Sequence, residues 1–248
     1  MALIKELEKQ GNWLFRHRGE LPVILFLIQV VVYFFTLKKG DYFFDDFNQW
    51  NFICLAVAFL GMWIRALVIG QVPKGTSGRN TVQGQVAEVL NSTGIYSVVR
   101  HPLYVGNFFM WLGIAMISQH LWFILVFILI YWIYYERIMY AEEQFLSKKF
   151  GEAYFAWSDK VPAFIPNLIL WKPSNLSFSF KNILKREYAG FFNTFLGFFI
   201  FEAQRAYVFQ YSITYTNGWL ILLVGSGVLA LVLRMLRKKT KLLDVEGR

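Results

Sequence analysis

Long apolar stretches recur along this chain, and short polar segments separate them. Six stretches approach the roughly 20 residues that a helix needs to cross the hydrocarbon core of a bilayer. They run from Leu21 to Leu37, Phe52 to Gly70, Tyr104 to Ser118, Leu121 to Tyr135, Gly190 to Phe201 and on toward Gln210, and Trp219 to Leu233. The fifth is the weakest because Glu202, Gln204 and Arg205 interrupt it. The pattern predicts an all-α integral membrane protein of about six transmembrane helices.

The third and fourth stretches are separated only by Gln119 and His120. Such a short linker leaves room for a tight turn and nothing else, so we expect these two helices to form a helical hairpin. Residues 1–20 carry several charges before the first apolar stretch, and they are expected to form an amphipathic helix on the membrane. The apolar blocks favour a single membrane domain over residues 1–248.

Composition agrees with a membrane protein. Hydrophobic residues make up 56% of the chain and the mean hydropathy is +0.42, above the apolar content of about 45–50% in soluble domains. The single cysteine, Cys54, has no partner for a disulfide and no ligand set around it, so no metal site is predicted. The net charge of +9 comes from basic residues that flank apolar stretches, which indicates a bilayer surface and not nucleic acid.

Lysine and arginine are distributed unevenly between the two ends of the predicted spans. If both termini are cytoplasmic, 21 of the 25 basic residues fall on the cytoplasmic side, where membrane proteins concentrate them. The same orientation places the two longest polar loops, Gln71 to Leu103 and Glu136 to Ala189, on that side. We therefore expect a multi-pass protein with a cytoplasmic site, in the inner membrane if the source is bacterial.

The two predicted loops carry the residues most suited to chemistry. The first ends in Arg-His-Pro-Leu-Tyr-Val-Gly over residues 100–106, where Pro102 fixes the start of a helix whose free N–H groups suit a carboxylate or phosphate. The second contains Glu142 and Glu143, then Phe-Gly-Glu-x-Tyr over 150–154 and Val-Pro-x-x-x-Pro over 161–166.

This ordered set resembles the isoprenylcysteine carboxyl methyltransferase family and its bacterial relatives. The resemblance covers residues 93–166, and residues 167–248 form an extension with two predicted spans. It implies a multispan enzyme that uses S-adenosylmethionine and acts on a membrane lipid or a lipidated acceptor. It also implies a catalytic role for Arg137 and Glu143, and cofactor contacts from Arg100, His101, Pro102, Tyr104, Gly106 and Glu142.

Each of these residues also has a structural interpretation. His101 can satisfy backbone groups at a helix start, and Tyr104 and Gly106 can serve interfacial anchoring and close helix packing. Glu142 and Glu143 can form a solvated face with neighbouring lysines. Both interpretations stay open at this stage.

Arg137 departs from the family pattern. In eukaryotic members an arginine precedes the last motif glutamate by five residues, and Ile138 stands at that spacing from Glu143, whereas Arg137 keeps it only to Glu142. Snorkelling to the interface is its structural interpretation. Arg65 and Arg186 are expected to assist in binding the acceptor, while charges within spans, such as Arg65 or Glu202 with Arg205, can equally form structural ion pairs.

The acceptor and the reaction leave alternatives. An ionised carboxylate or lipid phosphate, such as that of lipid A, needs no general base near neutral pH, whereas a phospholipid amine would need Glu142 or Glu143 as a base. Basic residues beside the membrane favour the anionic oxygen. The rival enzyme is an NADPH-dependent sterol or lipid double-bond reductase, and a transporter or scaffold is the rival without chemistry.

Overall fold

The computed structural model describes residues 2–73, 75, 85–210 and 217–247, which form eight α-helices and two short 3-10 helices and contain no β-sheet. The helices are α1 (Leu3–Arg16), α2 (Glu20–Lys39), α3 (Phe47–Gln71), α4 (Pro102–Met116), α5 (Leu121–Phe150), α6 (Glu152–Ser158), α7 (Phe180–Val208) and α8 (Asn217–Lys239). The 3-10 helices are η1 (Ile95–Ser97) and η2 (Leu168–Leu170). An all-α protein is confirmed.

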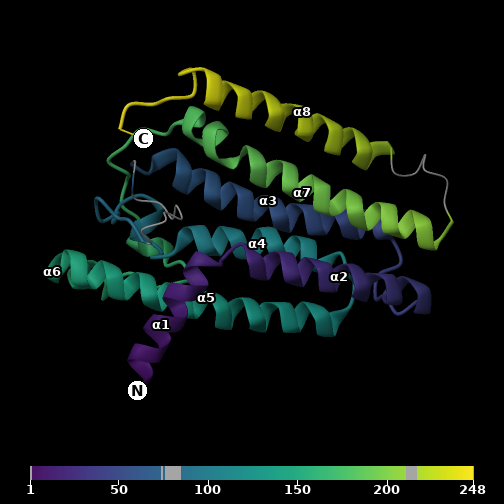
Figure 1. The fold of residues 1–248 in the computed structure, drawn as a ribbon, viewed down its shortest axis with the longest axis horizontal. Helices are drawn as coiled ribbons and strands as arrows, with labels where there is room; N and C mark the ends of the chain where they lie inside the picture. The colour runs from purple at the N-terminus through teal and green to yellow at the C-terminus, as the bar shows by residue number, and fades with distance from the viewer. Residues whose placement is uncertain (1, 74, 76–84, 211–216, 248) are drawn as a thin grey trace.

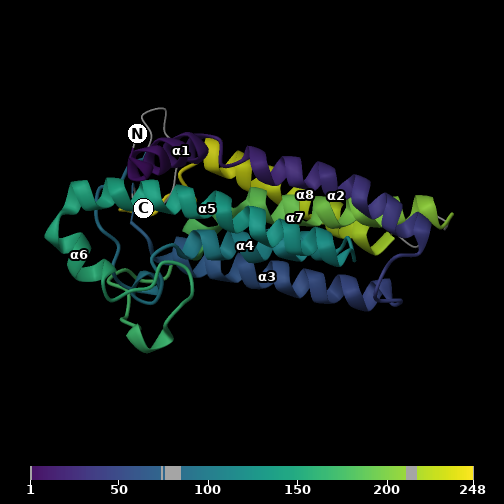
Figure 2. The same ribbon diagram turned by 90° about the horizontal axis from the view of Figure 1, so that it is seen from below.

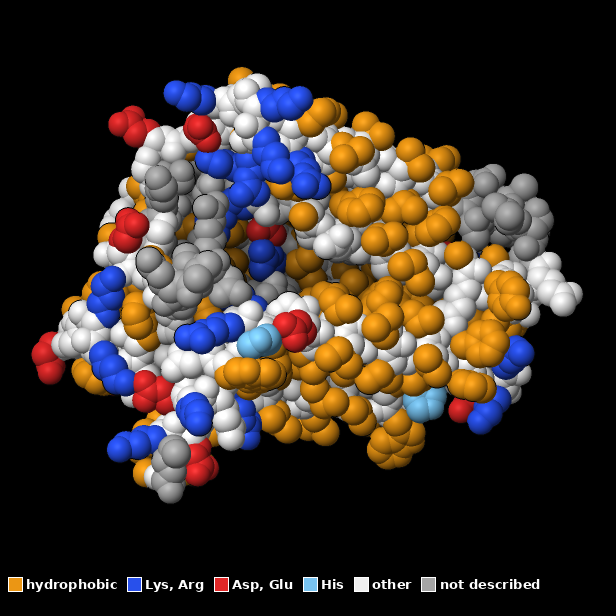
Figure 3. Space-filling model, in the orientation of Figure 1, with side chains coloured by type: hydrophobic (Ala, Val, Ile, Leu, Met, Phe, Trp, Pro, Cys, Tyr) orange, Lys and Arg blue, Asp and Glu red, His pale blue; other side chains and the backbone are white. Residues whose placement is uncertain are grey.

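The long helices run side by side as a bundle, and α1 crosses α5 at one end (Figures 1 and 2). Both ends of the chain, α6, residues 85–101 and the segment after α6 lie at that same end (Figure 1). Within the part of the chain that the structure describes, four helices are long and apolar enough to cross a membrane: α2, α3, α5 and α8. Large hydrophobic side chains are exposed along the bundle, as Figure 3 shows, so the chain is an integral multi-pass membrane protein.

The third and fifth predicted spans are also helices, α4 and α7. Helix α4 is apolar but has only 15 residues, fewer than the span-length helices. Helix α7 has 29 residues and includes Glu202 and Arg205, the charged residues that interrupt the fifth apolar stretch. Helices α4 and α5 run in opposite directions and are joined by residues 117–120 (Figure 1). Gln119 takes a left-handed φ of 49° in this turn, which allows the chain to reverse over so few residues.

Two helices are longer than the apolar pattern indicates. Helix α5 continues from Tyr135 to Phe150, and α7 begins at Phe180, ten residues before Gly190. Glutamate, arginine, glutamine and lysine are good helix formers, so a polar segment after an apolar span can extend the same helix. Glu142, Glu143 and Arg186 therefore lie on helices and not in loops.

Helices α3 and α4 approach closely because small residues line their contact. A Cβ on Gly113 would lie 2.5 Å from the carbonyl oxygen of Cys54 and 2.6 Å from the backbone nitrogen of Ala58. A Cβ on Gly61 would likewise lie 2.3 Å from the carbonyl oxygen of Gly106. Glycine at these positions lets the backbones meet, as in other helix pairs within membranes.

We therefore expect Gly113→Leu to destabilise the protein by about 1–3 kcal/mol, because the added side chain would overlap the backbone of α3. Thermal unfolding in detergent would measure the change. Gly225→Leu on α8 is the matched control, since a Cβ there meets nothing within 4 Å. Equal unfolding temperatures for the two variants would contradict this account of the α3–α4 contact.

Candidate functional site

The segment that leads into α4 is joined to the segment that follows α6. Backbone N–H groups of Arg100 and His101 donate to the carbonyl oxygens of Pro162 and Ala163, at 2.9 and 3.1 Å. The N–H of Asn167 donates to the carbonyl oxygen of Val98 at 2.9 Å. Two motifs more than fifty residues apart in the sequence are thus held together by main-chain hydrogen bonds.

His101 lies between the paired glutamates of α5. Its Nε2 is 2.9 Å from Oε1 of Glu143, and its Nδ1 is 3.5 Å from Oε2 of Glu142. The residue is 6% exposed, and Pro102 begins α4 directly after it. This contact fixes the N-terminus of α4 against the middle of the polar part of α5.

Burial by itself lowers the pKa of His101, because it disfavours the charged ring. Hydrogen bonds and opposite charges from Glu142 and Glu143 outweigh burial and raise the pKa above its usual value of 6.5. The arrangement therefore favours the imidazolium form, in which both ring nitrogens can donate to a carboxylate.

Arg100 connects the same cluster to the second motif segment. Its Nη1 donates to the carbonyl oxygens of Ser158 and Val161, at 2.6 and 3.1 Å. Its Nε lies 2.9 Å from Oε1 of Glu143. Glu143 thus lies beside two basic side chains, Arg100 and His101. Through these contacts Arg100 and Glu143 hold the segment before α4 and the segment after α6 together.

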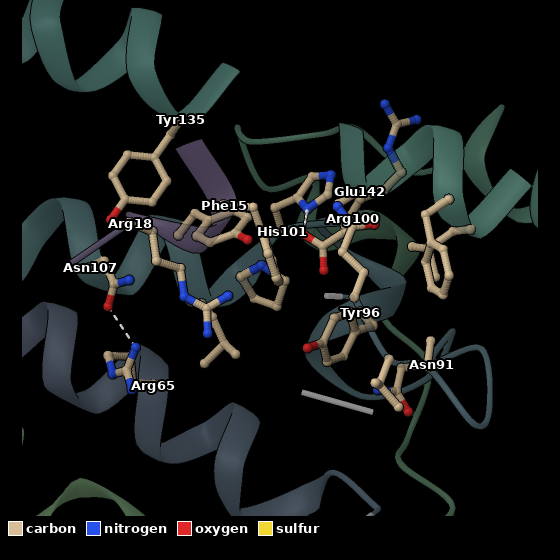
Figure 4. Close-up of a pocket in the computed structure, with 18 of the residues that line it drawn as sticks. Phe15, Arg18, Arg65, Asn91, Tyr96, Arg100, His101, Asn107, Tyr135 and Glu142 are labelled. Carbon is tan, nitrogen blue, oxygen red and sulfur yellow. Dashed lines mark hydrogen bonds and ion pairs between the residues drawn. The ribbon is translucent and has the colours of Figure 1, made fainter. Parts of the chain in front are cut away.

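A cavity of about 380 Å³ opens beside this cluster, within the roughly 300–1,000 Å³ of small-molecule sites. Its lining includes Arg100, His101, Pro102, Tyr104 and Glu142, which the sequence predicted as one group, and Arg65 and Arg186 also line it. Figure 4 shows the labelled side chains around it. Glu143 does not line the cavity but holds His101 from behind.

Aromatic rings form one wall of the cavity. The rings of His101 and Tyr104 are stacked with centroids 5.7 Å apart, and Tyr104 lies 5.0 Å from Tyr135. Tyr135 in turn stacks on Tyr131 at 4.2 Å, and the Tyr131 hydroxyl donates to the carbonyl oxygen of Tyr104 at 2.8 Å. The sequence interpretation missed the α5 tyrosines, although their spacing of four residues places them on one helix face.

Helix α1 and the residues directly after it line part of the cavity, which the sequence did not predict. Phe15 and Arg18 line the cavity, and the Arg18 guanidinium lies 4.4 Å from the centroid of the Phe15 ring. Tyr96 of η1 and Asn91 line it from another side (Figure 4). No sequence signal linked Phe15 and Arg18 to the motifs, because only the packing of α1 on α5 brings them near, whereas Tyr96 lies within the motif region 93–166.

Gly106 serves helix packing and does not line the cavity. A Cβ at this position would lie 2.6 Å from Cγ of Arg65 and 2.9 Å from the carbonyl oxygen of Gly61. Glycine here lets the Arg65 side chain pass over α4. Of the two sequence interpretations of Gly106, the geometry favours packing.

Arg65 stands where the cavity meets a second hollow. Its Nε and Nη2 donate to the two carboxylate oxygens of Glu187, both at 2.7 Å, and its Nη1 donates to Oδ1 of Asn107 at 2.6 Å. A groove of about 450 Å³ begins here, between α2, α4 and α7. Arg65, Asn107, Trp111 and Arg186 line both the cavity and the groove.

The groove is largely apolar beyond that junction. Its walls include Phe26 of α2, Ile114 of α4 and Ile200 of α7. Figure 3 shows the surface hollowed between α2 and α7, with hydrophobic side chains beside it and basic ones near one end. A polar cavity and a largely apolar groove therefore meet at two arginines, Arg65 and Arg186.

Arg137 lies away from both hollows. Its Nε donates to Oε1 of Gln10 at 3.1 Å, and it lines a different, more open groove between α1 and α5. Because α5 is one continuous helix, a residue five positions before Glu142 points about 140° away from it around the axis. The structure thus does not bring Arg137 together with the other predicted site residues.

Comparison with known proteins gives partial matches. The family model described as phospholipid methyltransferase matches residues 50–153. The chain is 32% identical over 121 residues to protein-S-isoprenylcysteine O-methyltransferase of Schizosaccharomyces pombe, covering 48% of this chain and 51% of that protein. It is 28% identical over 161 residues to the nickel-cobalt-cadmium resistance protein NccN of Alcaligenes xylosoxydans xylosoxydans, covering 65% and 70%.

A third relative is the cobalt-zinc-cadmium resistance protein CzcN of Cupriavidus metallidurans, 32% identical over 91 residues, with coverage of 37% of this chain and 42% of that protein. The chain spans about half the length of the isoprenylcysteine methyltransferases that it matches. No solved structure matches it. The matched region includes His101, Glu142 and Arg65, whereas Arg186 and Glu187 lie beyond the family model.

We expect the His101 cluster to make stability depend on pH. Because the pKa of His101 is raised in the folded protein, its stabilisation is fully present below about 6.5 and is lost as the pH rises through the folded value. Unfolding temperatures measured from acidic to alkaline pH should fall across that window. His101→Gln should flatten the fall, and His17→Gln, at the residue directly after α1, should keep it. An unchanged profile for His101→Gln would refute the linkage.

Proposed function

We propose that this chain, which is related to the phospholipid and isoprenylcysteine methyltransferases of membranes, transfers a methyl group from S-adenosylmethionine to an anionic oxygen of a lipid. The observation that carries the proposal is the junction at Arg65, Asn107, Trp111 and Arg186. There the polar cavity beside His101 meets the apolar groove. A hydrophilic cofactor and a lipid acceptor need such a pair of adjoining sites.

The donor set of the cavity fits the cofactor. S-adenosylmethionine combines a carboxylate, an ammonium, a sulfonium and an adenine ring, and when bound it supplies an activated methyl group. The cavity offers cationic side chains, the carboxylate of Glu142, tyrosine rings and the amide of Asn91. A carboxylate and aromatic faces favour a positively charged ligand, while arginine favours a carboxylate. We assign Glu142, Tyr104 and Tyr96 to cofactor binding.

His101 and Arg100 have a positioning role in this proposal. His101 holds the two glutamates, and Arg100 holds Glu143 and the segment after α6. Together they fix the cavity wall before any ligand binds, which reduces the entropy that orientation costs. In this proposal the packed rings of Tyr104 and Tyr135, with Tyr131 stacked on Tyr135 outside the cavity lining, would keep water from entering between α4 and α5.

The acceptor is assigned to the groove, with its tail among apolar side chains and its head at the junction. Arg65 and Arg186 would orient an ionised carboxylate or phosphate, which needs no general base near neutral pH. Arg18 adds a third cation to the cavity lining. A phospholipid ammonium would meet these arginines, so the charge of the site favours the anionic acceptor.

We also propose the topology that this function requires. Helices α4 and α7 would cross with α2, α3, α5 and α8, giving six spans in one membrane domain over residues 1–248. A bilayer can thin locally around the short helix α4. The excess of basic residues and the common end of both termini support a cytoplasmic site (Figure 1). In this arrangement α1 would lie on the cytoplasmic surface.

Cofactor binding provides a direct test. Isothermal calorimetry of the purified protein should detect S-adenosylhomocysteine and not NADPH. Glu142→Gln should weaken that binding about tenfold, because it removes the carboxylate that the cavity offers. Glu136→Gln, on the exposed side of the same helix, is the matched control and should bind as the wild type does. Binding of NADPH alone would instead favour a reductase.

Transfer activity tests which arginine serves the acceptor. Incubation of membrane lipids with methyl-labelled S-adenosylmethionine, followed by mass spectrometry, would locate the label. Arg65→Gln should lower transfer about 100-fold, since loss of a half-buried charge at the junction removes acceptor orientation. Arg137→Gln should stay within about threefold of wild type, because its side chain lies on another helix face. The reverse pattern would restore Arg137 as the catalytic arginine.

A further inference from the structure

Glu187 sits on the groove side of the junction. It lines the groove but not the cavity, whereas its partner Arg65 lines both. Its carboxylate accepts from Nε and Nη2 of Arg65, each at 2.7 Å, in the bidentate geometry that guanidinium forms with carboxylates and phosphates. When a lipid head group approaches along the groove, the carboxylate of Glu187 therefore already occupies Arg65.

This anion occupies the donors that the proposed acceptor needs. The Arg65 side chain is 21% exposed and that of Glu187 is 15% exposed, so the pair is neither fully buried nor freely solvated. Removing the carboxylate from Arg65 without replacement would leave a half-buried cation, which is costly. Exchange of one anion for another keeps the cation paired, and the displaced Glu187 carboxylate would turn into the groove that it lines, where water can solvate it.

We propose that Glu187 is a specificity-determining residue that stands in for the acceptor's anionic oxygens. It holds Arg65 in the orientation that receives the acceptor, and a lipid carboxylate or phosphate then takes its place on the same two N–H donors. A neutral or zwitterionic head group offers no net charge to replace it. The inference rests on the proposed function, because it takes the lipid in the groove to be the acceptor.

A purely structural ion pair is the alternative, and the chain contains one for comparison. At the other end of α7, Glu202 pairs with Arg205 at 2.7 Å and accepts from the side-chain amide of Asn51. Glu202 is 1% exposed and lines neither the cavity nor the groove. Glu187 differs in facing a groove, so the two glutamates of one helix form a matched pair of sites.

The experiment measures lipid binding to the full-length protein in detergent, without cofactor, by native mass spectrometry. The probes are oleate for a lipid carboxylate, dioleoyl phosphatidic acid for a lipid phosphate, and dioleoyl phosphatidylcholine as the zwitterionic control. Glu187→Gln should bind one or both anionic lipids about tenfold more tightly than wild type, because the competing charge is gone. Binding of phosphatidylcholine should stay unchanged.

Glu202→Gln is the control variant and should keep the wild-type affinity for each lipid. A gain with oleate alone identifies a carboxylate acceptor, and a gain with phosphatidic acid alone identifies a phosphate. Equal or weaker binding of both anionic lipids by Glu187→Gln overturns the proposal, because a structural pair would lose the placement of Arg65.

A second variant covers the case in which Glu187→Gln does not fold. The double change Arg65→Gln with Glu187→Gln removes the pair without leaving an unpaired charge. It should bind phosphatidic acid and oleate no more tightly than the wild type does, because Arg65, the residue that would receive the anion in place of Glu187, is gone, and tighter binding of either lipid overturns the proposal.

These binding measurements separate the inference from the methyl transfer itself. If Glu187→Gln binds anionic lipids more tightly but the transfer experiment yields no labelled lipid, the anion exchange at Arg65 is upheld and the proposed methyl transfer is refuted. If labelled lipid forms but Glu187→Gln binds anionic lipids as the wild type does, the methyl transfer is upheld and the anion exchange is refuted.

Discussion

The contact of the His101 ring with Glu142 and Glu143 joins the start of α4 to the polar part of α5. Arg100, next in the chain, joins Glu143 to the carbonyl groups that follow α6. These four charged side chains join two separate motif segments into one wall of the cavity. The backbone hydrogen bonds from Arg100 and His101 to residues 162 and 163 connect the two loop segments to each other, and the charged side chains attach them to helix α5. The cavity and its aromatic wall depend on this cluster, since both are built on α4 and α5.

A second constraint comes from charges among helices that face lipid. Ionisable groups in such places need partners, and Arg65 finds Glu187 and Asn107 while Arg205 finds Glu202. The glycine at 106 makes the first arrangement sterically feasible by giving the Arg65 stem a path across α4. Packing and electrostatics are therefore linked at this point, because the absence of a side chain on Gly106 of α4 allows Arg65 of α3 to reach its partners.

The sequence predicts the helical class, because apolar blocks of span length are a strong signal in any context. It predicts the grouping of His101 with Glu142 and Glu143 through motif order. Helix ends are predicted less well, since polar helix formers after Tyr135 extend α5 without changing its composition in an obvious way.

Residues supplied by distant helices were beyond prediction. Phe15 and Arg18 reach the cavity only through the packing of α1 on α5, and Glu187 was assigned to a loop. Arg137 illustrates a different limit. Its spacing to Glu142 fits the motif, but a continuous helix places the two side chains on different faces. Spacing identifies a role only when the helical phase is also known.

If the proposed function is correct, one part of the chain binds the cofactor and another part completes the groove for the acceptor. The family model covers residues 50–153, which supply α4, most of α5 and the His101 cluster. The outer wall of the groove comes from α7, which begins at Phe180 and contributes Arg186 and Glu187 to the junction. Arg186 lines both the cavity and the groove, but Glu187 lines the groove alone, so a residue outside the cavity can set the charge of the acceptor while the His101 cluster stays the same. Glu187 is such a residue, since it reaches the reaction only through Arg65.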